Sequence, residues 1–222
     1  MIADLACHSV LAVCAHPDDE SFGLGAILST LAAHGTATAL VCCTRGEAST
    51  LGNTDPRSLA DVRATELATA AAALGLGAVT ALAHPDGGLA ATPLHELASE
   101  IARAAVAVAA DCLLVFDEGG VTGHPDHQAA TAAALVAAES LGLPVLAWVI
   151  PADVTRLLDD EFGTAFVGRE PSEVDVVLEV DRTRQLAAIE CHGTQATDNP
   201  VLRRRLELQG NVETLRWLGR AD

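Results

Sequence analysis

Short apolar runs alternate with longer amphipathic stretches along most of the chain. The short runs are continuous, as expected for strands covered on both faces in a parallel sheet, and the longer stretches repeat apolar residues at helical spacing. The pattern predicts strands at residues 10–15, 37–44, 78–83, 112–116, 145–150 and 174–180, and helices at 22–34, 58–74, 93–109, 125–141, 182–191 and 202–218. This order indicates right-handed strand–helix–strand units and a Rossmann-like α/β fold, with a mostly parallel sheet flanked by helices.

The chain has 222 residues, which is enough for one full hydrophobic core, and we expect a single domain over residues 1–222. The pattern weakens over residues 151–172, where acids and glycine surround one weak helical stretch. We expect this segment to be a lid or an insertion. Residues 174–180 alternate apolar and polar positions, which is typical of an edge strand.

The formal net charge of −17 argues against a nucleic acid or an anionic membrane as partner, because both bind cationic surfaces. All 13 basic residues are arginine and tyrosine is absent, which excludes a Schiff-base lysine, a P-loop lysine and a tyrosine acid. The six cysteines form no CxxC pair and are expected to be small core residues of a reducing cytoplasm.

Residues 1–8 show no signal-peptide pattern, and no apolar run reaches the roughly 20 residues of a membrane span. We therefore expect a cytoplasmic protein that acts on a small molecule, either as a monomer or as a homo-oligomer.

Two polar segments with similar sequences, each beginning His-Pro-Asp, follow predicted strands. The sequence His-Pro-Asp-Asp-Glu at residues 16–20 follows the first strand, and His-Pro-Asp-His at residues 124–127 follows the fourth. Ligands of open α/β sheets bind outside the carboxyl ends of the strands, so both segments should meet at one edge of the sheet. Two histidines, a carboxylate and an open position are what a hydrolytic zinc site requires.

The spacing of these residues predicts their roles. His16 and Asp19, three apart on the turn into a helix, are predicted metal ligands, and His127, one turn into a later helix, is the third. Asp18 is the predicted general base. His124, with Asp126 as its orienting partner, is expected to stabilise an oxyanion or to donate a proton to a leaving amine.

Each motif also has a simpler interpretation. A lone His-Pro-Asp is usually a helix-start turn whose acid interacts with the helix N-terminus, so the prediction depends on the two motifs together. The sequence His-Pro-Asp at residues 84–86 is either a substrate-facing loop or a structural turn. Iron(II) is an alternative to zinc, because two histidines and a carboxylate can hold it.

The two motifs resemble the PIG-L/LmbE-like family of zinc-dependent N-acetylglucosaminyl deacetylases, which includes enzymes of mycothiol and bacillithiol synthesis and the GlcNAc-phosphatidylinositol de-N-acetylases. Further stretches are similar to that family: Arg-x-x-Glu at residues 63–66, Asp-Gly at 86–87 and His-Gly-Thr-Gln at 192–195, where the family has serine for threonine. The resemblance implies a hydrolase that removes the acetyl group from an N-acetylated amino sugar or a related small glycoconjugate, with zinc held by the three predicted ligands.

The resemblance also implies that Arg63, Asp86 and Glu47 contact sugar hydroxyls. For Arg63 the alternative is a surface ion pair with Glu66, one helical turn away. Glu47 is equally compatible with a solvated loop acid. His192 is predicted to be a core or sheet-edge histidine, and the alternative is a residue that supports the site from behind the groups that touch metal or substrate.

The chain departs from the family at Thr122, where some members have a tyrosine. A relative that keeps its metal but has lost turnover is therefore one alternative, and a thiol-conjugate amidase of the same family is another. The competing class is a non-catalytic, Rossmann-like small-molecule binding protein. Gly23-Leu-Gly25 hints at a nucleotide loop but lacks the third glycine of that motif.

Overall fold

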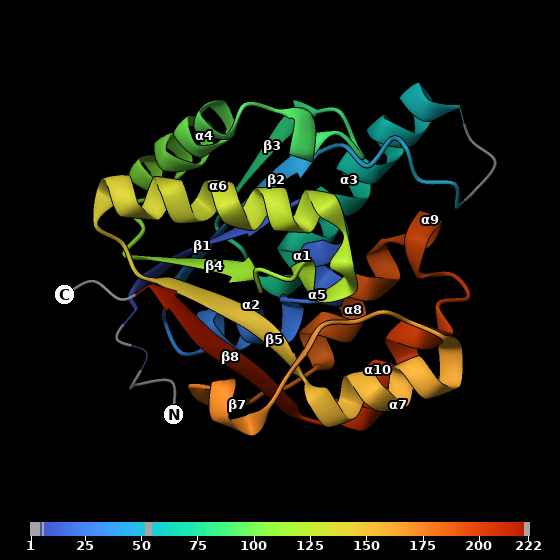
Figure 1. The fold of residues 1–222 in the computed structure, drawn as a ribbon. Coiled ribbons are helices and arrows are strands. Elements are labelled where there is room, and N and C mark those ends of the chain that lie inside the picture. The colour runs from blue at the N-terminus through green and yellow to red at the C-terminus, as the bar shows by residue number, and fades with distance from the viewer. Residues whose placement is uncertain (1–4, 6, 52–54, 220–222) are drawn as a thin grey trace.

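The computed structural model describes residues 5, 7–51 and 55–219, which form a central sheet between layers of helices (Figure 1). The strand order is β3-β2-β1-β4-β5-β8-β7, and β6 (Gly168–Arg169) pairs with β5. The parallel strands are β1 (Ser9–Cys14), β2 (Ala37–Thr44), β3 (Ala78–His84), β4 (Cys112–Phe116) and β5 (Val145–Pro151). β8 (Val212–Gly219) runs antiparallel to both β5 and β7 (Val176–Glu179). The predicted mostly parallel α/β fold is confirmed.

Helices cover both faces of the sheet. α4 (Leu94–Ala107) and α6 (Pro125–Leu141) lie on one face, and α2 (Gly25–Ala33), α3 (Pro56–Leu74), α8 (Thr183–Cys191) and α10 (Pro200–Gln209) lie on the other (Figure 1). The remaining short elements are α1 (Asp19–Phe22), α5 (Gly120–Gly123), α7 (Ala152–Phe162), α9 (Gly193–Ala196) and the 3₁₀ turns η2 (Leu89–Ala91) and η3 (Pro171–Glu173).

The central strand β1 explains why the strand sequences are continuously apolar. Val10 and Ala12 pack in the core under α2, whereas Leu11 and Val13 pack in the core under α4 and α6. Side chains of a strand alternate between its faces, so a strand covered on both faces needs apolar residues at every position. The carboxyl end of β1 is thereby fixed in the middle of one sheet edge.

The predicted helix at residues 22–34 is divided, because α1 ends at Phe22 and α2 begins at Gly25. A Cβ atom at Gly23 would lie 2.6 Å from the Phe116 ring and 2.9 Å from Trp148. The glycine is therefore required by close packing on β4 and β5, which accounts for the Gly23-Leu-Gly25 sequence without a bound nucleotide.

The predicted helix at residues 202–218 is wrong beyond Gln209. α10 ends there, Gly210 turns the chain with φ 54° and ψ −132°, and residues 212–219 form β8. Threonine, tryptophan and alternating apolar residues favour a strand over this stretch, and β8 is inserted between β5 and β7. β7 lies at the edge of the sheet, as predicted for residues 174–180.

Residues 151–172, the expected lid or insertion, contain α7, β6 and η3. Val154 and Leu158 of α7 are buried in the core, so the helix is anchored to the body of the protein. A lid function of this segment stays a prediction.

All six cysteines are free, and Cys14, Cys42, Cys43 and Cys112 are buried, as expected for small core residues. Within the described ranges, no helix is long and apolar enough to cross a membrane. The N-terminal stretch, for which the sequence predicts no signal peptide, lies largely outside the described residues.

A buried carboxylate ties β4, β6 and β8 together. Asp117 is fully buried, and its Oδ2 accepts hydrogen bonds from Arg169 Nε at 2.9 Å and Nη2 at 2.5 Å. Its Oδ1 accepts from Arg216 Nε at 2.5 Å. Replacing Asp117 by alanine is expected to lower the free energy of unfolding by about 3–5 kcal/mol, because two arginines lose their buried partner. Chemical denaturation measures the loss.

The surface pair of Glu161 and Arg204 provides a matched control. Its two hydrogen bonds are both 2.8 Å long, within the 2.5–2.9 Å range of those of Asp117, but Glu161 lies at the exposed surface. Glu161→Ala should therefore change the unfolding midpoint little. Equal losses in the two variants would contradict the role assigned to burial.

Candidate metal centre and active site

The backbone after β1 separates two neighbouring carboxylates. Asp18 has φ 129° and ψ −28°, a conformation that costs energy in a residue with a side chain. Its carbonyl oxygen accepts the N–H groups of Ser21 at 3.0 Å and Phe22 at 2.7 Å, which starts α1 at this point. As a result, Asp19 faces the histidines, whereas Asp18 faces a polar pocket with Arg63.

The three predicted ligands converge on one point. His127 Nε2 lies 3.1 Å from Asp19 Oδ1 and 3.3 Å from His16 Nδ1, and His16 Nδ1 lies 3.7 Å from Asp19 Oδ2. Ligand atoms about 2.0–2.2 Å from a tetrahedral zinc ion lie about 3.3–3.5 Å from one another. All three residues are buried, so the donor set and its spacing fit a zinc ion at this point.

Hydrogen bonds on the far side of each ring leave the required lone pairs free. His16 Nε2 lies 3.1 Å from Asp86 Oδ1, and His127 Nδ1 lies 3.0 Å from the carbonyl oxygen of Gly120. Each of these nitrogens therefore carries the proton, and the other nitrogen of each ring faces the centre unprotonated when the ring is neutral. Metal-binding histidines are commonly oriented in this way.

Negative charge dominates the centre. Burial lowers the pKa of His16, but the hydrogen bond to Asp86 and the charges of Asp19 and Asp86 outweigh it and raise the pKa to about 9. Burial likewise lowers the pKa of His127, but the charge of Asp19 and the hydrogen bonds to Asp19 and Gly120 together outweigh burial and raise the pKa. Burial raises the pKa of Asp19, yet His127 and His16 hold it well below its usual range. The site therefore favours positive charge, as a cation-binding centre must.

Asp126 has a different place from the one expected. Its fully buried carboxylate accepts the N–H groups of Gly87 at 2.8 Å and Leu89 at 3.1 Å, and Oδ2 lies 3.3 Å from His16 Nε2. Asp126 meets His124 through its backbone N–H, which donates to His124 Nδ1 at 3.2 Å. Asp126 thus contacts His124 through its backbone and not through its carboxylate, which supports His16 and the loop after β3.

His124 stands at the entrance of the site, with its ring 4.8 Å from that of His16. Burial and the positive charges of His16 and His127 lower the pKa of His124, which favours the neutral ring. Because Nδ1 accepts the N–H of Asp126, the proton of the neutral ring lies on Nε2. His124 can therefore donate a hydrogen bond through Nε2 without first being protonated.

Arg63 is buried and pairs with Asp18, its Nη2 lying 3.1 Å from Asp18 Oδ2. It also donates to the carbonyl oxygens of Pro17 and, at 2.6 Å, of Gly46. The surface pair with Glu66 that the sequence left open is wrong. Burial, followed by the charge of Asp19, raises the pKa of Asp18 to about 7, although Arg63 acts in the opposite direction.

Glu20 and His192 form hydrogen bonds that hold the backbone of Asp18 in place. Glu20 Oε2 accepts the backbone N–H of Asp18 at 2.9 Å, and Glu20 Oε1 lies 2.6 Å from both His192 Nε2 and the Ser21 hydroxyl. Glu20 and His192 are both fully buried. His192 is thus a core histidine as predicted, and through Glu20 it also supports the proposed base, which is the alternative that the sequence left open.

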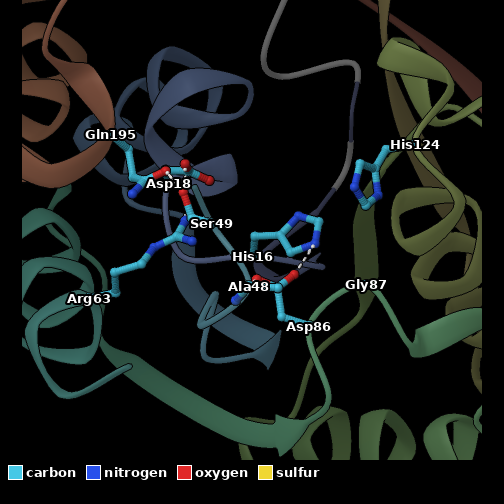
Figure 2. Close-up of a pocket in the computed structure, with 9 residues that line it drawn as sticks. All are labelled: His16, Asp18, Ala48, Ser49, Arg63, Asp86, Gly87, His124 and Gln195. Atoms are coloured by element: carbon cyan, nitrogen blue, oxygen red, sulfur yellow. Dashed lines mark hydrogen bonds and ion pairs between the residues drawn. The ribbon is translucent and has the colours of Figure 1, made fainter. Parts of the chain in front are cut away.

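These groups surround a polar pocket of about 260 Å³, in which Asp18 and Arg63 lie on one side and His124 on the other (Figure 2). Asp86 lines it as well, and its Oδ2 accepts the N–H of Ala48 at 2.8 Å. Glu47 does not line this pocket; its Oε1 accepts the N–H of Asp86 at 3.0 Å and holds that loop. Sugar contacts by Arg63, Asp86 and Glu47 stay predictions.

The loop at residues 84–86 combines both interpretations of its sequence. Asp86 faces the pocket, whereas His84 turns to α4 and pairs with Glu100 at 2.5 Å. Ser49 and Gln195 also line the pocket and are joined by a 2.9 Å hydrogen bond. The sequence resemblance at residues 192–195 pointed to Gln195, but no motif singled out Ser49.

Glu20→Gln tests the support of Asp18. Glutamine offers one acceptor oxygen where Glu20 serves Asp18, Ser21 and His192, so the backbone at Asp18 loses a fixed partner. A displacement of about 1 Å in an active site can cost about 100-fold, and we expect kcat to fall about 10- to 100-fold with metal content unchanged. Amine release and elemental analysis measure both quantities.

Glu100→Gln is the matched control, because Glu100 also pairs with a histidine but lies outside the pocket. It should leave kcat close to that of the unaltered protein. A similar loss of kcat in both variants would show that Glu20 acts through general stability alone.

The fold and the site together define a Rossmann-like α/β protein with a centre of two histidines and one carboxylate at the carboxyl edge of its sheet. The sequence profile of the PIG-L family, described as GlcNAc-PI de-N-acetylase, matches residues 11–138. This is more than half of the chain, and the protein belongs to that family.

A curated relative is similar to this chain over a limited segment. The 1D-myo-inositol 2-acetamido-2-deoxy-alpha-D-glucopyranoside deacetylase of Kineococcus radiotolerans is 45% identical over 83 residues, which are 35% of this chain and 23% of that protein. The matched segment thus spans less than a quarter of the curated relative.

Solved structures share the fold over nearly the whole chain. The N,N'-diacetylchitobiose deacetylase of Pyrococcus horikoshii has a TM-score of 0.73 and 22% identity, covering 96% of this chain and 85% of that one. GalB, the 4-carboxy-2-hydroxymuconate hydratase of Pseudomonas putida KT2440, has a TM-score of 0.67 and 21% identity, covering 95% and 96%. These likenesses bear on the fold alone, and the site has to carry the argument for a reaction.

Proposed function

We propose that this protein is a metal-dependent hydrolase, with zinc as its metal, that removes the acetyl group from an N-acetylated amino sugar or a related small glycoconjugate. The observation that carries the proposal is the convergence of His16, Asp19 and His127 within 3.1–3.7 Å, beside a pocket whose walls carry Asp18 and His124. The relative from Kineococcus radiotolerans, named a deacetylase of a 2-acetamido sugar, supports the substrate class.

His16 Nδ1, Asp19 and His127 Nε2 would hold the metal ion. When bound there, zinc supplies Lewis-acid polarisation of the amide carbonyl and lowers the pKa of a water molecule. Iron(II) suits the same donors and is the alternative metal.

Asp18 takes the proton of the attacking water. Its pKa is raised to about 7, mainly by burial, so it can accept a proton near neutral pH and return it to the departing amine. Arg63 holds the carboxylate and Glu20 holds the backbone of Asp18, which fixes the direction of the transfer.

His124 stabilises the negative charge that develops on the carbonyl oxygen. Its Nε2–H points away from the Asp126 N–H that occupies Nδ1, and it stands on the wall opposite Asp18 (Figure 2). Donors fixed in advance at such a position are worth more than donors in water. Arg63 and Asp86 face the same pocket and would bind sugar hydroxyls.

Metal content and amine release test the proposal together. The purified protein should hold about one zinc or iron ion per chain and release amine from N-acetylglucosamine derivatives. An intact protein that binds no metal after reconstitution would refute the mechanism and leave the non-catalytic binding protein as the better account. A panel that includes thiol conjugates separates the deacetylase from the amidase of the same family.

A further inference from the structure

A second cavity, of about 310 Å³, lies beside the metal centre and shares no lining residue with the polar pocket. It is bounded by α1, α5, β5, the loop after α7 and α10. Its walls are mostly apolar and include Phe22, Val121, Trp148, Phe166 and Leu202. Apolar cavities of this size with a few polar groups are typical small-molecule sites.

Contacts connect this cavity to the metal centre. Thr122 lines the cavity, and its hydroxyl lies 3.3 Å from His127 Nδ1. Trp148 packs against Phe116 with ring centroids 5.0 Å apart, and Phe116 packs against His127 at 4.8 Å. The apolar cavity therefore adjoins the metal centre through Thr122 and through the Trp148–Phe116 pair.

The wall of the cavity contains backbone strain. Val121 has φ 57° and ψ −55°, a conformation that is rare for a β-branched residue, and its carbonyl oxygen accepts the N–H of Val167 at 2.7 Å. Strain of this kind persists only where the surrounding structure enforces it, and it gathers at binding sites. Asp18 is the other strained residue beside the same centre.

The positive charge of Arg205, which lines the cavity, is already paired with groups of the protein. Arg205 lies 5.0 Å from the centre of the Trp148 ring, and it donates to the carbonyl oxygen of Phe22 and, at 2.6 Å, to Gln209. Glu213 Oε1 stands 3.9 Å from the same guanidinium. A free anion would find the cation engaged, so the walls favour a neutral apolar group.

We propose that this cavity is an apolar subsite that accepts a hydrophobic substituent of the N-acylated substrate, an inference that rests on the proposed hydrolase function. The cavity volume of about 310 Å³ is far more than the methyl of an acetyl group requires and leaves room for an alkyl chain of several carbons. The chain belongs either to the acyl group or to the aglycone of the sugar.

Kinetics with the metal-loaded, full-length protein distinguish the two sources. One series is N-acetyl-, N-butanoyl-, N-hexanoyl- and N-octanoylglucosamine, and the other is N-acetylglucosamine with methyl to octyl groups at the anomeric oxygen. Each methylene that enters the cavity should raise kcat/KM about fourfold. The series that shows the rise identifies the source, and a flat response in both overturns the proposal.

Val201→Phe narrows the cavity from α10, and Val106→Phe makes the same change on α4, where the valine is 66% exposed. Val201→Phe should remove the dependence on chain length, and Val106→Phe should preserve it. If both variants keep it, the chains bind elsewhere and the proposal fails.

Binding without turnover separates this proposal from the proposed function. Trp148 lines the cavity, so N-octanoylglucosamine should change the tryptophan emission of the protein and of a Trp217→Phe variant, but not of Val201→Phe. This change with no amine release from any substrate would overturn the hydrolase and retain the subsite. Amine release whose rate and substrate binding do not depend on chain length would retain the hydrolase and overturn the subsite.

Discussion

The Asp19→Asn variant is expected to lose stoichiometric zinc binding while its fold remains intact. The two oxygens of Asp19 have separate tasks: Oδ2 accepts the N–H groups of Ala15 at 3.1 Å and His16 at 2.9 Å, and Oδ1 lies 3.1 Å from His127 Nε2. Asparagine can keep its single oxygen on the two backbone donors. Its amide nitrogen then faces the histidines, where it offers the metal no lone pair.

The expected loss of zinc affinity in Asp19→Asn is larger than the loss caused by changing a residue that only hydrogen-bonds to a metal ligand. Changing an outer partner of a metal ligand typically costs 10- to 100-fold in affinity, so removing the only carboxylate among the three proposed ligands should cost more than about 100-fold. Elemental analysis after gel filtration and competition with a chromophoric chelator measure the change. Amine release should fall to background in parallel.

Asp111→Asn is a close control at the opposite end of β1. Asp111 accepts the backbone N–H groups of His8 and Ser9 at 2.9–3.1 Å, just as Asp19 accepts those of Ala15 and His16. It has no part in the metal centre, so its variant should bind zinc normally. If Asp19→Asn retained zinc at full affinity, the metal would have to be held by another set, such as His16 with His124 and His127, whose ligand atoms lie within 4.8 Å of one another.

The sequence predicted the fold where one local rule dominated. β2 and α6 begin and end at the predicted residues, because a strand covered on both faces is continuously apolar and a helix between proline and Gly142 has clear limits. Residues 202–218 failed, because apolar positions there fit both periods and the choice between helix and strand depends on β5 and β7 as neighbours.

The predicted ligands were found together because the first motif directly follows β1 and the second follows the neighbouring parallel strand β4 after the short helix α5, and the carboxyl ends of these strands share one edge. The supporting contacts could not be predicted, because they join residues far apart in the sequence. Glu20 and His192 are 172 residues apart, and Asp126 is 39 residues from Gly87. Neither contact follows from spacing, because the first needs α1 to meet the end of α8 and the second needs α6 to meet the loop after β3.

This difference has a consequence for the chemistry of the site. The motifs identify the residues that would touch metal or substrate, whereas contacts that form only in the folded chain set the protonation and direction of these residues. Gly120 fixes the proton of His127, Asp86 that of His16, and the backbone of Asp126 that of His124. The motif alone leaves these protonation states open.

The Asp18→Asn variant is expected to retain its metal and lose its turnover, with kcat lower by about 100- to 10,000-fold, the usual contribution of a general base. Asparagine has nearly the same shape, tolerates the positive φ angle of this position and can still accept the hydrogen bond of Arg63. The substitution therefore removes little except the ability to take a proton. Amine release under saturating substrate and elemental analysis measure kcat and zinc content.

Asp86→Asn distinguishes loss of proton transfer from loss of substrate binding. Asp86 lines the same pocket on the loop after β3, where it faces His16. Its variant should raise KM and weaken zinc binding by at most about 100-fold, because it touches a ligand from outside. Asp18→Asn should instead leave both KM and zinc content close to those of the unaltered protein. Full turnover in Asp18→Asn would move the base to another group, and His124, on the opposite wall of the pocket, would be the residue to replace next. The neutral ring of His124 is unprotonated only at Nδ1, however, and that nitrogen already accepts the N–H of Asp126. That geometry is the reason for assigning proton transfer to Asp18 and hydrogen-bond donation to His124.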